Sequence, residues 1–154
     1  MTSDIKATPV ASVFSIEASY LSAGRINVPL AETGDMWLSL KVNAEGGENA
    51  IHTHTKEDHA FIVFEGEVTF FDEKGNETVL GPYQGIVLPK GAFYRYLNTG
   101  GTNLFMLRVG TGARRGSDCE TRLGPGGQPI PGDAAENHHI EGVPIPGKFF
   151  GAQP

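Results

Sequence analysis

Alternating hydrophobic and polar positions are the main feature of the first two thirds of the chain. The clearest example runs from Met36 to Asn43, where every even-numbered residue is hydrophobic and the odd-numbered ones are Trp37 and three polar residues. Successive side chains of a strand point to opposite faces, so a two-residue period predicts a β-strand. No segment shows the pattern of a strong helix, and we therefore expect an all-β fold.

Further short strands are expected at regular spacing, with turn sequences between them. The chain has 21 Gly and 10 Pro residues, which suits short strands joined by tight turns better than a helical bundle. Pro29 is expected to end the strand that begins at Arg25. The arrangement predicts a β-sandwich or barrel. The expected strands are 13–16, 25–28, 36–42, 51–55, 59–64, 67–72, 77–80, 86–88, 94–98 and 103–109.

No internal repeat is present, so we expect one barrel rather than two. Residues 1–11 are expected to form a flexible N-terminal arm, 12–110 the barrel, and 111–154 a loop-rich C-terminal extension rich in Gly and Pro. The adjacent Phe149 and Phe150 indicate that this extension packs on the barrel or on a partner subunit. A mobile tail is the alternative.

Charge and composition exclude several classes of protein. The chain of 154 residues has a formal net charge of −6, and its one basic pair, Arg114-Arg115, is expected to be a solvated loop, so no nucleic-acid partner is predicted. The single cysteine, Cys119, allows no intrachain disulfide and has no histidine near it in sequence, which argues against a catalytic thiol. No signal peptide or membrane span is recognisable, so we expect no membrane partner and a cytoplasmic location.

Three histidines, His52, His54 and His59, fall close together in a region of expected strands. Residues two apart in a strand project to the same face with Cα atoms about 6–7 Å apart, so His52 and His54 can reach one ion. His59 opens the next expected strand and can face the same ion if the two strands are antiparallel neighbours. Imidazole is a good ligand for Zn, Fe, Ni and Cu, and the cluster predicts a metal site. Exposed turn histidines are the alternative.

The histidine segment resembles the first cupin motif, Gly-x5-His-x-His-x3,4-Glu-x6-Gly. Here it reads Gly46-x5-His52-x-His54-x4-His59-x6-Gly66, with His59 in place of the usual Glu. The second cupin motif, Gly-x5-Pro-x-Gly-x2-His-x3-Asn, resembles the segment Pro89-x-Gly91-x2-Tyr94-x3-Asn98. Its histidine is Tyr94 in this chain, and Tyr83 stands at its leading glycine.

The resemblance implies a small single-domain cupin, whose fold is a β-barrel of the double-stranded β-helix or jelly-roll type. The family's metal set of three His and one Glu becomes His52, His54 and His59 as ligands, with Tyr94 at the fourth position. One interpretation is an altered but working site, and the other is a decayed site without metal. Replacement of one good ligand by another favours the altered site.

The expected cofactor is one divalent ion, with Fe²⁺ favoured and Zn²⁺, Ni²⁺, Mn²⁺ or Cu²⁺ as alternatives. Three neutral imidazoles leave the full charge of the ion in place, so an anionic ligand is favoured beside it. Cupins with three His ligands include iron dioxygenases. The resemblance therefore implies oxygenase-type chemistry on a small enolic, phenolic or carboxylate molecule. A zinc or nickel lyase, isomerase or hydrolase and a non-catalytic binding cupin are the alternatives. The family's pairing of barrels, together with the apolar tail, predicts a homodimer.

Several other residues carry narrower expectations. The Tyr94 hydroxyl is expected to donate a hydrogen bond to a metal-bound anion, because a phenol stays protonated at neutral pH. Glu57 and Asp58 are expected to be solvated turn residues, or else carboxylates that hold the free N–H of a ligand histidine. His138 and His139 are expected in a polar loop, with a lid that supplies a histidine as the alternative.

Hydrophobic residues of the expected strands should fill the barrel. Those near its mouth are expected to form an apolar pocket wall for a small aromatic or enolic ligand. The residues assigned to this interior are Phe61, Val63, Phe93 and Met106.

Overall fold

The computed structural model describes residues 7–112 and 122–153 of the chain. The expectations about Arg114-Arg115 and Cys119 lie outside these residues. Within them the protein is built from strands and one short 3₁₀ helix, η1 (Ala135–Asn137), as the alternation of the sequence predicts. No helix in this part of the chain is long and apolar enough to cross a membrane.

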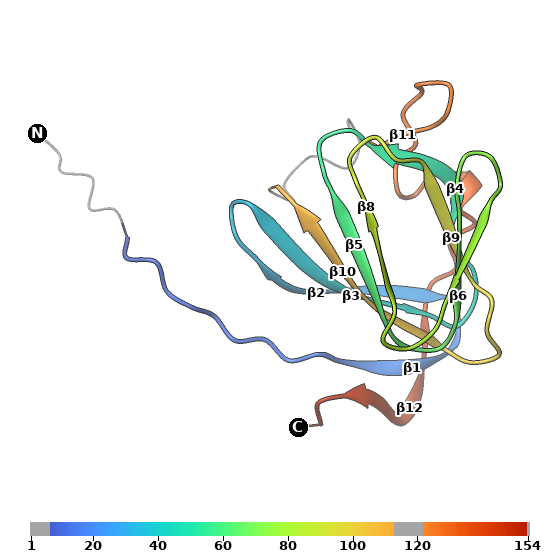
Figure 1. Cartoon of the computed structure of the whole chain (residues 1–154). Helices are drawn as coiled ribbons and strands as arrows, with labels where there is room; N and C mark the ends of the chain where they lie inside the picture. Colours follow the sequence, from blue (N-terminus) through green and yellow to red (C-terminus); the bar gives the residue numbers. More distant parts are fainter. Residues whose placement is uncertain (1–6, 113–121, 154) are drawn as a thin grey trace, which may run out of the picture.

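Two five-stranded antiparallel sheets form the walls of a jelly roll (Figure 1). One sheet has the order β2-β3-β10-β5-β8, the other β11-β4-β9-β6-β7, and β1 and β12 form a separate pair. The strands are β1 (Glu17–Ala23), β2 (Arg25–Glu32), β3 (Met36–Asn43), β4 (Gly47–His54), β5 (His59–Glu65), β6 (Val68–Phe71), β7 (Glu77–Leu80), β8 (Gly85–Leu88), β9 (Tyr94–Asn98), β10 (Leu104–Thr111), β11 (Arg122–Leu123) and β12 (Val143–Gly151).

Three local expectations about strands are wrong. Residues 13–16 form no strand: β1 begins at Glu17, and the preceding segment leads away from the body with Val13 almost fully exposed (Figure 1). Pro29 does not end β2, because β2 is an edge strand with a register shift beside Pro29, where a missing N–H is tolerated. No strand is expected beyond residue 109, whereas residues 143–151 form β12, which pairs with β1.

Two hydrophobic clusters lie on opposite sides of the β3–β10–β5 wall. The inner cluster lies between the two sheets and includes Phe61, Val63 and Met106. The outer cluster, centred on Leu40 and Phe105, lies under β1 and β12. The β1–β12 pair therefore gives this sheet a second hydrophobic face to bury.

Tyr83 shows why the second cupin motif begins with glycine. Its backbone has a φ of 68°, in the left-handed region that glycine enters without steric cost. The side chain is almost fully exposed, so packing does not compensate for the strain. The fold therefore keeps the turn of the motif although the preferred residue is missing.

Candidate metal centre

The three clustered histidines come from both walls of the jelly roll. His52 and His54 lie on β4, and His52 is paired across the strands with Tyr94 of β9. His59 lies on β5, in the opposite sheet. The condition that the two histidine strands are antiparallel neighbours is therefore not met. His59 reaches the other two across the interior, because strands that follow one another here alternate between the two sheets.

All three imidazoles are buried and close together. The ring centroids of His52 and His54 are 5.2 Å apart, and those of His54 and His59 are 4.1 Å apart. Exposure is 4% or less for each residue. The alternative of exposed turn histidines is therefore wrong.

The hydrogen bonds of His52 fix the ring nitrogen that is open to a ligand. Nδ1 lies 2.8 Å from the Ala50 carbonyl oxygen, so Nδ1 carries the proton and donates it. The lone pair of Nε2 then faces the Glu48 carboxylate oxygen Oε2 at 3.3 Å without a donor between them. Two buried acceptors in contact need a proton or a cation between them. A carbonyl that holds the other ring N–H is a common feature of metal-binding histidines.

Glu57 is part of the same cluster. Its Oε2 lies 2.9 Å from Nε2 of His59 and 3.8 Å from Nδ1 of His54. Its exposure is 3%, so the expected solvated turn residue is wrong, and Glu57 makes the contact with a histidine ring nitrogen that the alternative expects of a carboxylate beside a ligand histidine. Asp58 is half-buried and accepts the N–H of Lys90 in the turn. The ligand atoms of His54, Glu57 and His59 lie within 4.8 Å of one another, so this group could hold a metal ion.

The protein environment keeps the imidazoles of His54 and His59 neutral, which is the form that binds metals. Burial, followed by repulsion from His59 and Arg108, lowers the pKa of His54 to about 2. Burial also lowers the pKa of His59, although its hydrogen bond to Glu57 opposes the shift. The neutral imidazoles of His54 and His59 and the Glu57 carboxylate fit a divalent ion, whereas His52 lies beside His54 but outside this group of converging ligand atoms.

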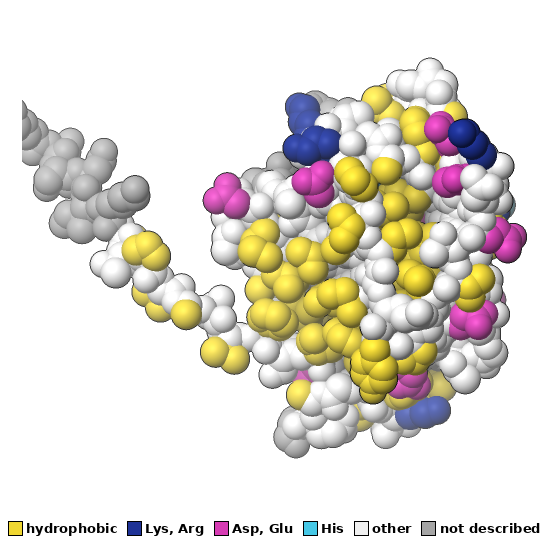
Figure 2. Space-filling model, in the orientation of Figure 1, with side chains coloured by type: hydrophobic (Ala, Val, Ile, Leu, Met, Phe, Trp, Pro, Cys, Tyr) yellow, Lys and Arg dark blue, Asp and Glu magenta, His cyan; other side chains and the backbone are white. Residues whose placement is uncertain are grey.

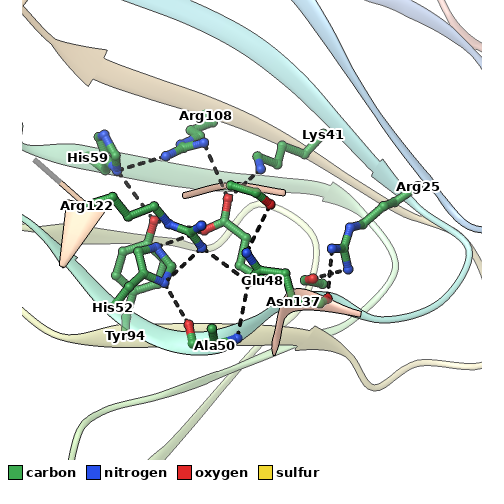
Figure 3. Close-up of polar contacts among 12 residues, drawn as sticks. Arg25, Lys41, Glu48, Ala50, His52, His59, Tyr94, Arg108, Arg122 and Asn137 are labelled. Carbon is green, nitrogen blue, oxygen red and sulfur yellow. Dashed lines mark hydrogen bonds and ion pairs between the residues drawn. The ribbon is translucent and has the colours of Figure 1, made fainter. Parts of the chain in front are cut away.

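Tyr94 presents a protonated hydroxyl to the cluster. The hydroxyl donates to Oε2 of Glu48 at 3.1 Å and lies 3.5 Å from Nδ1 of His59 (Figure 3). Burial, followed by the nearby Glu48 charge, raises the pKa of Tyr94 well above its usual value. The side chain can therefore act as a hydrogen-bond donor in the site.

A polar cavity of about 210 Å³ adjoins the cluster, with His54 in its wall. The expected apolar pocket wall is wrong, because Arg108 and Lys41 project into this space from the inner face of the sheet. Phe61, Val63 and Met106 do fill the interior, but they pack in the hydrophobic cluster. The cavity's charged side chains are Arg25, Lys41, Glu48, Arg108 and Arg122.

The sequence reasoning missed these charged residues, and for some of them a signal existed. Glu48 shares the face of His52 and His54 by the two-residue period of β4. Arg108 interrupts the hydrophobic run of β10, which marks an unusual position. Arg122 lies on a two-residue strand and gave no local signal.

The two tail histidines remain outside the cluster. His138 and His139 are both exposed, as a polar loop predicts. His139 lies at the rim of the cavity, where its Nε2 is 3.2 Å from a Glu141 carboxylate oxygen. Among the described residues, neither belongs to the group whose ligand atoms converge.

Comparison with known proteins gives a consistent fold. The profile of the Cupin domain family matches residues 40–110. No curated protein matches the chain in sequence. The segment 40–110 that matches the Cupin domain family includes all three clustered histidines, Tyr94 and Arg108.

Solved structures with the same fold share little sequence with this chain. KdgF from Halomonas sp. is 18% identical with a TM-score of 0.55, over 60% of this chain and 82% of KdgF. TT1209 from Thermus thermophilus is 23% identical with a TM-score of 0.55, over 62% of this chain and 90% of TT1209. The polyketide cyclase RemF from Streptomyces resistomycificus is 20% identical with a TM-score of 0.53, over 60% of this chain and 68% of RemF. At these identities the likeness concerns the fold alone.

Proposed function

We propose that the chain, whose residues 40–110 match the Cupin domain family, is a metal-dependent enzyme that holds one divalent ion at His52, His54 and His59 and acts on a small organic molecule. One observation carries the proposal: the buried rings of His52, His54 and His59 lie side by side next to a cavity, and the ligand atoms of His54 and His59 converge with that of Glu57. Three protein ligands leave further positions of an ion open, which is the arrangement of catalytic rather than structural metal sites. Glu57 either completes the set or orients His59.

When bound, the ion supplies Lewis-acid polarisation or, with iron, O₂ chemistry. The residues of the chain orient the ligands of the ion and contact the substrate. Glu57 holds the ring of His59 in place through the Nε2–H donor. The Tyr94 hydroxyl, which burial keeps protonated, donates to Glu48 and would turn to an anionic oxygen of the substrate. We assign Tyr94 as the catalytic hydrogen-bond donor.

Oxygenase-type chemistry with Fe²⁺ is the first proposal for the reaction. In a dioxygenase both atoms of O₂ enter the organic substrate, so no external reductant is consumed. A non-oxidative lyase, isomerase or hydrolase with Zn²⁺ or Ni²⁺ is the second, and one observation favours it. Burial, partly opposed by Glu48, lowers the pKa of Lys41 to about 8. A lysine with that pKa can exchange a proton near neutral pH, as an isomerase or lyase requires.

Metal titration tests the ligand set. Protein stripped with EDTA should bind one equivalent of Zn²⁺ by calorimetry, and Fe²⁺ likewise under argon. Single replacements His52→Gln, His54→Gln and His59→Gln should each abolish tight binding, whereas the matched control His139→Gln should bind as the unaltered chain does. Glu57→Gln should weaken binding about 10- to 100-fold, the usual effect of losing the partner of a ligand histidine. Unchanged affinity in His59→Gln would rule out the three-histidine set.

Activity screening distinguishes the two chemistries. Iron-loaded and zinc-loaded samples are incubated with small enols, phenols and carboxylates, with O₂ uptake and product masses recorded together. Uptake that needs iron and ends in a product heavier by two oxygen atoms supports the dioxygenase. Turnover in the zinc sample without O₂ uptake supports the lyase or isomerase. Binding without turnover under either metal would make the chain a non-catalytic binding cupin.

A further inference from the structure

The cavity beside the histidine cluster carries an unusual excess of positive charge. Four cationic side chains line it, and Glu48 is its one carboxylate among the described residues. Figure 3 shows Arg108 and Lys41 directed toward Glu48 from two strands, while the dashed lines from Arg122 lead to His52 and Asn137. The cavity is thus formed by residues far apart in the sequence, which meet only in the folded protein.

Glu48 forms ion pairs with two of these cations, Lys41 and Arg108. Oε1 of Glu48 lies 2.6 Å from Nζ of Lys41 and 3.4 Å from Nη1 of Arg108, so both cations share one oxygen. Arg122 contacts neutral acceptors instead: the Ile130 carbonyl oxygen at 3.2 Å and Oδ1 of Asn137 at 3.3 Å. Exposure is 8% for Arg108 and 4% for Arg122. Arg122 has no carboxylate partner among the described residues, and a buried cation without a counter-charge is costly, so the cavity favours an anion beside Arg122.

Arg25 has a different task and is not part of the binding group. Its guanidinium donates to the backbone carbonyl oxygens of Gly47 and Asn137, the latter at 2.9 Å. These bonds tie β4 to η1 at the wall of the cavity. Lys41, Arg108 and Arg122 are therefore the cations that face an incoming ligand.

We propose that this cavity is the binding site of a small organic carboxylate, held by Lys41, Arg108 and Arg122 next to the histidine cluster. The inference rests on the proposed function and narrows it, since it names the substrate class of the same site. Lys41 and Arg108 already bind one carboxylate inside the cavity, that of Glu48. Nη2 of Arg108 lies 3.3 Å from Nδ1 of His59 and 3.5 Å from Nε2 of His54, so a carboxylate bound there would lie beside the cluster.

The volume of the cavity and the geometry of its arginine side chains restrict the class of ligand further. A volume of about 210 Å³ lies below the roughly 300–1,000 Å³ of pockets that hold drug-sized molecules, so the ligand is a small metabolite. The planar fork of an arginine matches the two oxygens of a carboxylate, and it also matches phosphate. The test must therefore compare both anions and a neutral molecule of the same shape.

Calorimetry with malonate, malonamide and inorganic phosphate tests the inference in EDTA-treated and zinc-loaded protein. Malonate should bind 1:1, at least about tenfold more tightly than malonamide. Arg122→Gln should weaken malonate binding about tenfold, because it removes a buried charge-assisted donor. Glu48→Gln should strengthen binding, because it removes the internal carboxylate that competes for Lys41 and Arg108. Arg95→Gln, on β9 where the guanidinium packs over the ring of Phe71, is the matched control and should change nothing.

Arg122→Gln should weaken malonate binding and Glu48→Gln should strengthen it, so a general loss of structure cannot produce both results. Equal binding of malonate and malonamide, or weaker binding in Glu48→Gln, would overturn the inference, and tighter binding of phosphate than of malonate would overturn the carboxylate class. If Arg122→Gln does not fold, Arg122→Lys keeps the charge without the fork and should give an intermediate affinity. Zinc titration of the same samples separates the two proposals. Malonate binding without zinc binding contradicts only the metal site, and the reverse contradicts only the carboxylate site.

Discussion

Strand β3 has two buried faces of opposite character. Its hydrophobic face, with Leu40 and Val42, packs outward under the β1–β12 pair. Its other face places Lys41 in the cavity and the Trp37 ring against that of His59, with centroids 5.4 Å apart. A strand with one hydrophobic face usually turns that face to the inside of the domain. Here a strand from the end of the chain covers the hydrophobic face, so the polar face can line the site.

Strand β10 divides its residues in the same way. Phe105 points outward into the cluster beneath β12, and Arg108 points inward to the histidines. The comparison suggests that the outer face of this sheet carries stability and the inner face carries chemistry. Variants of the two faces should therefore have separable effects.

The largest effect is expected on the outer face. Phe105 is fully buried, and its ring stacks on that of Phe150 with centroids 4.1 Å apart. Phe105→Ala should lower the free energy of unfolding by about 3–5 kcal/mol in urea denaturation, because it opens a cavity beneath β12. Phe149→Ala, at the exposed neighbouring position, is the control and should cost less than about 0.5 kcal/mol. Zinc affinity of the folded Phe105→Ala protein should stay unchanged, and its loss would show that the two faces are not separable.

The inner face should dominate the pH dependence of stability of the metal-free protein. His54 stays neutral in the folded state because burial lowers its pKa to about 2, whereas the unfolded chain takes up the proton below pH 6.5. This contribution is complete above pH 6.5 and is lost as the pH falls toward 2, at up to about 1.4 kcal/mol per pH unit.

Urea denaturation at pH 6.5 and pH 5 measures this contribution. His54→Gln should lose about 2 kcal/mol less than the unaltered protein over this interval, because its side chain does not titrate. Phe105→Leu should shift stability equally at both pH values. An identical pH dependence in the unaltered protein and in His54→Gln would contradict the assignment.

The sequence could predict those features of the fold and the site that depend on residues close together in the chain, such as a strand and the face on which its side chains lie. The two-residue period predicts a strand over residues 36–42, and β3 spans Met36–Asn43. The spacing of His52 and His54 places both side chains on one face of β4. The same period cannot tell which face of a strand lies inside, because that depends on β12, more than a hundred residues later. Pro144 and Pro146 also hide β12, since prolines oppose a strand except at a sheet edge such as this pair.

The charged half of the site was hidden for the same physical reason. Glu48 and Arg108 are 60 residues apart and meet only when β4 and β10 face each other across the jelly roll. Arg122 reaches His52 from a separate segment 70 residues away. A metal motif is local and can be recognised, whereas a ligand pocket is assembled by the fold.

A smaller effect is expected at Tyr94, where the two sheets meet. Tyr94→Phe removes the hydroxyl that donates to Glu48 and keeps the ring volume, so stability should fall by about 1.5 kcal/mol. Zinc stoichiometry should remain one, and malonate affinity should fall. Loss of zinc would make Tyr94 a ligand, and unaltered malonate affinity would make it a wall residue. Calorimetry on the two proteins side by side distinguishes these outcomes.

The smallest effect on folding concerns the part of the outer face that β12 leaves open. Figure 2 shows hydrophobic side chains over the region of β5 and β8, where Ile62 and Val87 are 39% and 70% exposed. Val10 and Val13 of the N-terminal segment are also exposed, at 86% and 98%. Together these surfaces are the kind that a second copy of the chain covers, and we propose a homodimer through this face.

Replacement of one residue on this face should separate association from folding. Ile62→Lys places a charge in the proposed interface, so light scattering after size exclusion should change from a dimer to the 16.4 kDa monomer. The free energy of unfolding of the monomer should change by less than about 0.5 kcal/mol, because the side chain is already partly in water. Thr78→Lys, on the exposed β7 of the other sheet, should remain a dimer. If the unaltered chain is a monomer at about 100 µM, a concentration well above a micromolar dissociation constant, the open face has another role.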